Sequence, residues 1–296
     1  MASVDIGIDL GTATVLVYVG DRGIVLREPS VVAVNSRTGE VLSVGQDAHE
    51  MLGKTPAQIT AIRPLEEGVI SDYKMTEEMI KYFLRKASPG TVLKPRVALC
   101  VPSLITAVEA QAAVDAAVTA GARSVYLIEE PVAAAIGAGI ELTRPKGNII
   151  LDIGGGTSDI AVLSLSGIVC KNSIRVAGDK LNGAIVKYVR SAYNLLIGER
   201  MAEQLKIGAA SMDEDADNQI FEVKGRHLVS GLPVRQIISR KELYPVVHDC
   251  IAEIRDAVHA VVERTPPELV GDLYENGLVM TGGGALLHGL GKYLSK

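Results

Sequence analysis

The feature that most constrains the fold is a glycine turn between two apolar runs in the middle of the chain. Residues 149–163 read Ile-Ile-Leu-Asp-Ile-Gly-Gly-Gly-Thr-Ser-Asp-Ile-Ala-Val-Leu. Apolar runs of this kind predict two buried strands, and the glycines predict the tight turn of a hairpin. With no Cβ on Gly154, Gly155 and Gly156, backbone N–H groups of the turn can converge on phosphate oxygens. Asp152 would then face a phosphate-bound Mg²⁺, although a structural turn with a solvated aspartate explains this stretch alone equally well.

Similar stretches lie near both ends of the chain. Residues 5–19 run from a strand through Asp9 and a small Gly-Thr turn into a second strand. Residues 277–287 form a strand that enters a glycine turn, followed by a helix-like apolar run whose first N–H groups would suit a nucleotide. Because the two Asp-turn-Thr hairpins lie about half the chain apart, they indicate an internal duplication. Two like domains could then clamp one polyphosphate from both sides.

The composition places the chain among globular proteins and excludes several classes. The 296 residues are 48% hydrophobic with a net charge of −5, which is ordinary for a protein of about two domains. There is no basic tract, no tryptophan and only two phenylalanines, so nucleic acid is not an expected partner. The five histidines and the three cysteines (Cys100, Cys170 and Cys250) show no metal-ligand or disulfide spacing, which favours a reducing cytosol.

The sequence contains little that would hold the chain in a membrane. No run approaches the roughly 18 apolar residues of a membrane-spanning helix, and Met1 leads into a strand rather than a signal peptide. The loop at residues 88–95 places Val92 and Leu93 beside basic residues. We favour an ordinary lead-in to the next strand, and a peripheral contact with a bilayer surface is the alternative.

Strands and helices alternate in the first half. We expect a strand at 97–101, a helix at 108–120, a strand at 124–128 and a helix at 132–139. Such alternation with short connections predicts an α/β fold that contains parallel strand pairs. Glu130 and the glutamate before it fall between a strand end and a helix start, the usual active-site edge of such a sheet. Capping of the helix dipole is the alternative role for both.

Further helices are predicted on either side of these elements. A helix at 75–87 has Thr76 as its candidate N-cap and a core-facing stripe of Met79, Ile80, Phe83 and Leu84. In the second half we expect helices at 181–193, from residue 198 onward, and at 242–263, the last ending before two prolines.

One pair of charged residues in the second half is spaced for interaction. Glu203 and Lys206 share one face of the helix that starts near residue 198, at the i and i+3 positions. An ion pair on a solvated face is the simplest explanation of these two residues. The acidic loop at 211–218 is expected to be solvated as well.

These motifs together resemble a known superfamily. The two hairpins, residues 129–137 and the closing Thr281-Gly282-Gly283-Gly284 resemble the actin, Hsp70 and sugar-kinase superfamily. Five further stretches resemble, in order, the MreB family of bacterial actin homologues: residues 28–33, 62–70, 198–200, 230–233 and 265–269.

The resemblance implies an α/β, actin-like two-domain fold. Each half would be a mixed β-sheet with flanking helices of the ribonuclease H type, with a small insertion subdomain and the nucleotide cleft between the halves. The implied core subdomains are 1–31 with 67–145 and 146–181 with 246–296, and the implied insertions are 32–66 and 182–245.

The resemblance also assigns roles to single residues around ATP and Mg²⁺. Asp9 and Asp152 would lie near the metal, and Glu130 and Asp152 would serve hydrolysis by orienting or activating the attacking water. The implied nucleotide contacts are Gly11, Thr12, Ala13 and Thr14 in a first phosphate loop, Gly154, Gly155, Gly156 and Thr157 in a second, Glu203 and Lys206 around the ribose and base, and Gly282, Gly283, Gly284 and Ala285 at the adenosine.

The chain departs from the family pattern at three places. Thr14 stands where the family often has Asn, and its hydroxyl still donates, so we expect a tuned site. Family members usually continue beyond Lys296 with a strand and helix that return to the first domain, so we expect truncation or altered stability and assembly. No N-terminal amphipathic helix is visible, so membrane attachment would depend on Val92 and Leu93.

The function implied by the resemblance is that of a cytoskeletal ATPase. The chain would polymerise with itself into filaments, hydrolyse ATP slowly, and organise cell-wall synthesis with shape proteins from the cytoplasm, at the inner face of the cytoplasmic membrane. Another actin-like filament for plasmid partitioning or division, a small-molecule kinase and an Hsp70-like ATPase are the alternatives. The sequence shows no sugar-reading residues for the kinase and no substrate-binding domain for the chaperone.

Overall fold

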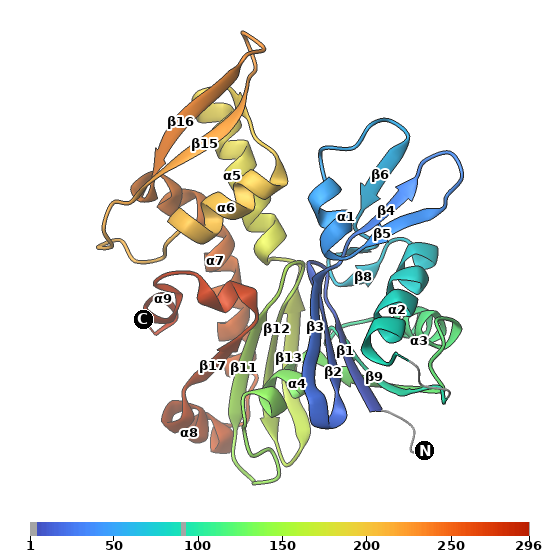
Figure 1. Ribbon diagram of the computed structural model, residues 1–296. Helices are drawn as coiled ribbons and strands as arrows, with labels where there is room; N and C mark the ends of the chain where they lie inside the picture. The colour runs from blue at the N-terminus through green and yellow to red at the C-terminus, as the bar shows by residue number, and fades with distance from the viewer. Residues whose placement is uncertain (1–4, 90–92, 296) are drawn as a thin grey trace.

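Two mixed β-sheets form the centre of the molecule in a computed structural model that describes residues 5–89 and 93–295. The two sheets lie side by side, and a smaller insertion extends from each toward the same end of the molecule (Figure 1). Helices pack on the sheets, so the predicted α/β class is confirmed.

The first sheet has the strand order β10-β9-β1-β2-β3. Strands β1, β2 and β3 form an antiparallel meander, and β9 and β10 then add in parallel beside β1. Alternate residues of β1 are buried against helices α2 and α3, which leaves Asp9 on the other face, beside Cys100 in register. The elements are β1 (Asp5–Leu10), β2 (Thr14–Val19), β3 (Gly23–Pro29), α2 (Tyr73–Ala87), β9 (Arg96–Val101), α3 (Ala107–Thr119), β10 (Ser124–Glu129) and the 3₁₀ turn η1 (Gly20–Arg22).

The N-terminus of helix α2 differs from the prediction. The Asp72 side chain caps the helix by accepting a hydrogen bond from the Met75 N–H at 3.0 Å. Thr76, the predicted cap, lies inside the helix, fully buried, and donates to the Asp72 carbonyl at 2.8 Å. The prediction was wrong because an acidic cap was available earlier in the chain. The predicted apolar stripe is confirmed as core.

The second sheet repeats this arrangement with the order β13-β12-β11-β17. Its first three strands again form an antiparallel meander, and β17 adds in parallel to β11. Helices α5 and α7 cover one face, and α4 packs on the other through Ala135. The elements are α4 (Glu130–Gly137), β11 (Asn148–Ile153), β12 (Ser158–Ser164), β13 (Gly167–Ile174), α5 (Gly178–Tyr193), α7 (Arg240–Glu263), α8 (Pro267–Asn276), β17 (Leu278–Thr281), the 3₁₀ turn η2 (Gly283–Leu286) and α9 (Leu290–Leu294).

Both insertions share buried residues with the main core of their half. The first contributes Val32 and Val44 and also has a small cluster around Ala33 and Ala48, and the second contributes residues such as Val223. The elements of the first are β4 (Val32–Asn35), β5 (Val41–Val44), α1 (Gln46–Met51) and β6 (Ile59–Ile62), followed by β7 (Leu65–Glu66) and β8 (Val69–Ile70). Those of the second are β14 (Leu195–Leu196), α6 (Glu199–Ala209), β15 (Ile220–His227) and β16 (Pro233–Ser239).

The sequence interpretation missed helix α8 and placed the start of α7 too late. Ser239 and Glu242 form a capping box, so α7 begins at Arg240. The two prolines that end α7 do not open a loop, because Pro267 occupies the first turn of α8, where a missing N–H costs nothing.

Candidate functional site

The two predicted phosphate turns meet where the two sheets approach each other. A Cβ built on Gly155 would lie 2.5 Å from the Cβ of Ala13, and one on Gly156 would lie 2.5 Å from Thr12 Oγ1. Only glycine fits at these two positions, because a side chain would collide with the opposite turn. The residues predicted from two distant stretches are therefore brought together.

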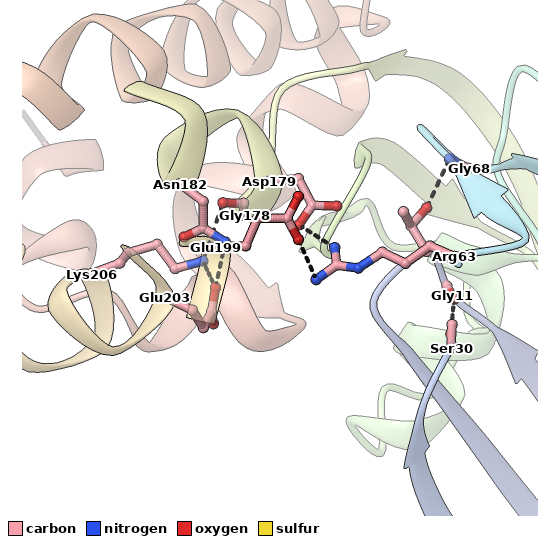
Figure 2. Close-up of polar contacts among 11 residues, drawn as sticks. Gly11, Ser30, Arg63, Gly68, Gly178, Asp179, Asn182, Glu199, Glu203 and Lys206 are labelled. Atoms are coloured by element: carbon pink, nitrogen blue, oxygen red, sulfur yellow. Dashed lines mark hydrogen bonds and ion pairs between the residues drawn. The ribbon is translucent and has the colours of Figure 1, made fainter. Parts of the chain in front are cut away.

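The first turn is braced by hydroxyl groups. Ser30 donates from its Oγ to the Gly11 carbonyl at 2.5 Å and from its N–H to the Ala13 carbonyl at 3.0 Å. Thr12 Oγ1 accepts the Gly68 N–H at 2.9 Å (Figure 2). Ser30 was not predicted as a site residue, although it lies in the stretch 28–33 that carries the family resemblance. Thr14 opens β2 directly after this turn.

The second turn is braced by backbone hydrogen bonds from the start of α5. The Gly178 N–H donates to the Gly154 carbonyl at 3.2 Å, and the Asp179 N–H donates to the Gly155 carbonyl at 2.8 Å. Thr157 closes the turn, since its carbonyl accepts the Gly154 N–H at 2.9 Å. The position of this turn therefore depends on the position of α5.

Four desolvated carboxyl groups lie near the turns: Asp9, Asp152 and Asp159 on the strands that flank them, and Glu130 at the start of α4. Burial, with the charge of Asp152 added, raises the pKa of Asp9 to about 7, and burial also raises the pKa of Asp152. Burial, followed by the charge of Asp159, raises the pKa of Glu130 well above its ordinary value. Such a cluster of acids favours a bound cation or a proton.

Asp9 and Asp152 fit a metal ion whose other ligands are phosphate oxygens and waters. Among residues 5–89 and 93–295, no group of three or more His, Cys, Asp or Glu side chains could hold a metal ion by itself. Magnesium, however, commonly binds with one or two carboxylates plus waters and phosphate oxygens. Asp9 and Asp152 offer two mutually repelling carboxylates that such an ion would neutralise.

Asp159 is a further buried acid, and it was not predicted as a site residue. It lies opposite Asp152 in the β11–β12 pairing and is fully buried. Its Oδ1 accepts the Ser103 N–H at 2.7 Å, so it links the second sheet to the loop after β9 in the first half. The sequence could have indicated this residue, because a hairpin that turns at Gly154 to Thr157 pairs Asp152 with Asp159.

Glu203 and Lys206 form the predicted ion pair, at 2.7 Å, but the lysine does not lie on a solvated face. Only 13% of the Lys206 side chain is exposed, and its Nζ also donates to the Gly178 carbonyl at 3.1 Å. Glu203 accepts from Asn182 Nδ2 at 2.7 Å, so α6 is tied to the start of α5 (Figure 2). This pair is therefore joined to the second turn.

The third glycine turn packs against the end of β11. Gly282 has a φ of +81°, and a Cβ there would lie 2.3 Å from the Ile153 carbonyl oxygen and 2.5 Å from Asp152 Oδ1. Gly283, Gly284 and Ala285 then form a short 3₁₀ turn. The predicted helix-like run is thus a 3₁₀ turn and not an α-helix.

The predicted membrane contact is only partly visible. Val92 lies outside the described residues, and Leu93 is 43% exposed. Within the described parts of the chain, we find no helix with the length and apolar character needed to cross a membrane.

Known proteins resemble the chain over nearly its whole length. The family model described as MreB/Mbl protein matches residues 3–296. Cell shape-determining protein Mbl of Bacillus subtilis (strain 168) is 50% identical over 293 residues, which cover 99% of this chain and 88% of that protein. Cell shape-determining protein MreB of Escherichia coli (strain K12) is 45% identical over 300 residues, which cover 99% of this chain and 86% of that protein.

A solved structure shows the same fold. MreB5 of Spiroplasma citri bound to AMPPNP matches with a TM-score of 0.93 at 39% identity, covering 99% of this chain and 88% of that one. Its ADP-bound form matches equally well. The predicted actin-like two-domain fold is therefore confirmed, and the chain belongs to the MreB/Mbl family.

Proposed function

We propose that this chain binds ATP with Mg²⁺ between its two halves and assembles into actin-like filaments that help determine cell shape. The observation that carries the proposal is the direct contact of two glycine turns from two similar sheets, with Asp9 and Asp152 at the adjoining strand ends. The relatives named as cell shape-determining proteins, and a 39% identical MreB5 solved with AMPPNP and with ADP, support it.

In the proposed site, each glycine turn would contact a different part of the nucleotide. The first and second turns would donate backbone N–H groups to the phosphates, with Thr12, Thr14 and Thr157 as hydroxyl donors. Glu203 and Lys206 would contact the ribose and base, and Gly282 to Ala285 would cover the adenosine. Asp9 and Asp152 would hold Mg²⁺, which supplies charge neutralisation for the phosphates when bound.

Glu130 is a candidate residue for the slow hydrolysis. We assign Glu130 and Asp152 to orienting the attacking water, because both carboxyls lie in the acidic cluster. Burial raises the pKa of Glu130 in the nucleotide-free chain. With nucleotide bound, its carboxyl would hold the attacking water or accept its proton.

Assembly and location complete the proposal. Head-to-tail contact between identical subunits does not close into a ring and so gives a filament. We place the filament at the inner face of the cytoplasmic membrane with proteins of cell-wall synthesis, and exposed Leu93 is its candidate membrane contact. The subdomain division predicted from the sequence is carried over as part of this proposal.

Sedimentation combined with electron microscopy tests the proposal, with Mg-ATP, Mg-ADP or no nucleotide, and with or without anionic liposomes. We expect ATP-dependent filaments that the Asp152→Ala variant does not form. Liposome-dependent filaments that a Leu93→Ser variant fails to form would support the membrane contact. A chain that binds ATP, stays monomeric throughout and phosphorylates a small molecule would contradict the proposal and indicate a kinase.

A further inference from the structure

A segment of the first half reaches across to the second half beside the two turns. It comprises residues 63–68, within the stretch 62–70 whose role the proposed function leaves open. Its far end touches the second turn, because a Cβ on Gly156 would lie 2.9 Å from Glu67 Cα, and one on Gly68 would lie 2.8 Å from Thr157 Cγ2. The segment is thus held within contact distance of the proposed phosphate site.

The near end of the segment carries Arg63, which contacts two acids of the second half. Its Nη1 lies 3.0 Å from Asp179 Oδ1, and its Nη2 lies 3.5 Å from Glu199 Oε2. Figure 2 shows the guanidinium of Arg63 directed at these carboxylates from the opposite side of the interdomain region. The planar fork of an arginine suits two acceptors at once, which a lysine cannot match.

Both acids belong to the helices that support the nucleotide site. Asp179 is the second residue of α5, and its N–H donates to the Gly155 carbonyl of the second turn. Glu199 opens α6, whose Lys206 bonds to the Gly178 carbonyl. Arg63 of the first half therefore contacts the N-terminal residues of both helices. Both helices are also tied to the second phosphate turn.

A second ion pair crosses between the halves and gives a natural comparison. Arg175 lies 3.2 Å from Glu67, but 61% and 58% of these two side chains are exposed. For Arg63 and Asp179 the exposed fractions are 25% and 35%, whereas Glu199 is 70% exposed, so Asp179 is the main partner of Arg63. Exposed pairs contribute little because water screens them, so Arg63 is the stronger connection of the two.

We propose that Arg63 is an interdomain latch, which holds the two halves together through Asp179 and Glu199 and so slows the release of bound nucleotide. The part concerning nucleotide release depends on the proposed function. When the latch is open, the start of α5 moves away from the first half, and the second turn follows because α5 supports its backbone. The latch thereby sets how long a nucleotide stays bound.

The test measures release and opening separately. Mant-ATP with Mg²⁺ is displaced by excess unlabelled ATP below the assembly concentration, and hydrogen exchange is followed without nucleotide in peptides that cover residues 177–182. For Arg63→Ala we expect release about fivefold faster and faster amide exchange in those peptides. Arg63→Lys should fall between the parent and Arg63→Ala.

The matched control is Arg175→Ala, which removes the exposed crossing pair and should change neither quantity by more than about a factor of 1.5. Circular dichroism and thermal unfolding show whether each variant is folded. Unchanged exchange in a folded Arg63→Ala variant would overturn the latch, and so would equal effects of Arg63→Ala and Arg175→Ala. If Arg63→Ala exchanges faster but the parent binds no mant-ATP, the interdomain contact stands. The role in nucleotide release and the proposed function are then both rejected.

Discussion

The first and second turns have similar sequences and equivalent places in their sheets, yet different groups hold them. Side-chain hydroxyls of Ser30 and Thr12 brace the first turn, with one backbone hydrogen bond from the Ser30 N–H to the Ala13 carbonyl. Backbone N–H groups of Gly178 and Asp179 brace the second. A hydroxyl is lost by one substitution, whereas a backbone donor remains after any substitution except proline. The duplicated framework therefore tolerates different supports, and the second turn is coupled to helix motion in a way that the first is not.

The largest effect is expected where the turns touch. Gly156→Ala places a Cβ 2.5 Å from Thr12 Oγ1 and 2.9 Å from the backbone of Glu67, so one turn has to move. We expect a loss of about 2–4 kcal/mol in the free energy of unfolding, together with loss of nucleotide binding. Urea unfolding and mant-ATP titration measure the two effects.

Gly183→Ala is the control for that change. Gly183 lies inside α5 with open space around it, so alanine should stabilise the helix by about 0.5–1 kcal/mol. If Gly156→Ala were as harmless as this control, the close contact of the turns would be wrong.

We expect the ionised Asp9 carboxylate to lower the free energy of unfolding when no cation is bound beside it. The folded pKa of Asp9 is about 7 against an ordinary 3.8, so the folded state binds more protons in that interval and stability falls as pH rises through it. Asp9→Asn should therefore gain about 1–3 kcal/mol at pH 8, and little at pH 4, in nucleotide-free buffer. Thermal unfolding across this pH range measures the gain, and a pH-independent difference would argue against a desolvated Asp9.

The hydroxyl brace of the first turn can be removed alone. Ser30→Ala deletes the bond to the Gly11 carbonyl in a fully buried position. We expect a cost of about 1–2 kcal/mol in the free energy of unfolding and roughly tenfold weaker nucleotide binding. Ser191→Ala, which removes an exposed hydroxyl bonded to its own helix, serves as the control and should cost less than about 0.5 kcal/mol.

Acid should weaken the support of the second turn. Burial opposes the shift, but hydrogen bonds from Ser239, Tyr193 and Tyr188 lower the pKa of Glu242 to about 2, which ties α5 to α7. The contribution of Glu242 to the free energy of unfolding is fully present above its ordinary pKa of 4.5. This contribution is lost as pH falls toward 2. We expect Glu242→Gln to reduce the acid dependence by about 1 kcal/mol between pH 5 and pH 3. An unchanged acid profile, measured by urea unfolding, would show that Glu242 is not responsible.

The position of most candidate site residues was predictable because they are consecutive in turns. Gly11 to Thr14, Gly154 to Thr157 and Gly282 to Ala285 each follow a strand, and a strand end locates a turn from the sequence alone. Asp9 and Asp152 were predictable for the same reason. Ser30, Asp159 and Arg63 were not assigned to the site, because their partners lie at least 17 positions away in the chain.

The sequence by itself determined the α/β class, the duplicated hairpins and the turns, because glycine content and apolar periodicity act over a few residues. Only the tertiary structure decided which groups brace each turn, that the pKa of Asp9 is raised, and that Arg63 spans the two halves. These properties depend on distances and burial between remote segments, and packing sets such distances only once both sheets are in place.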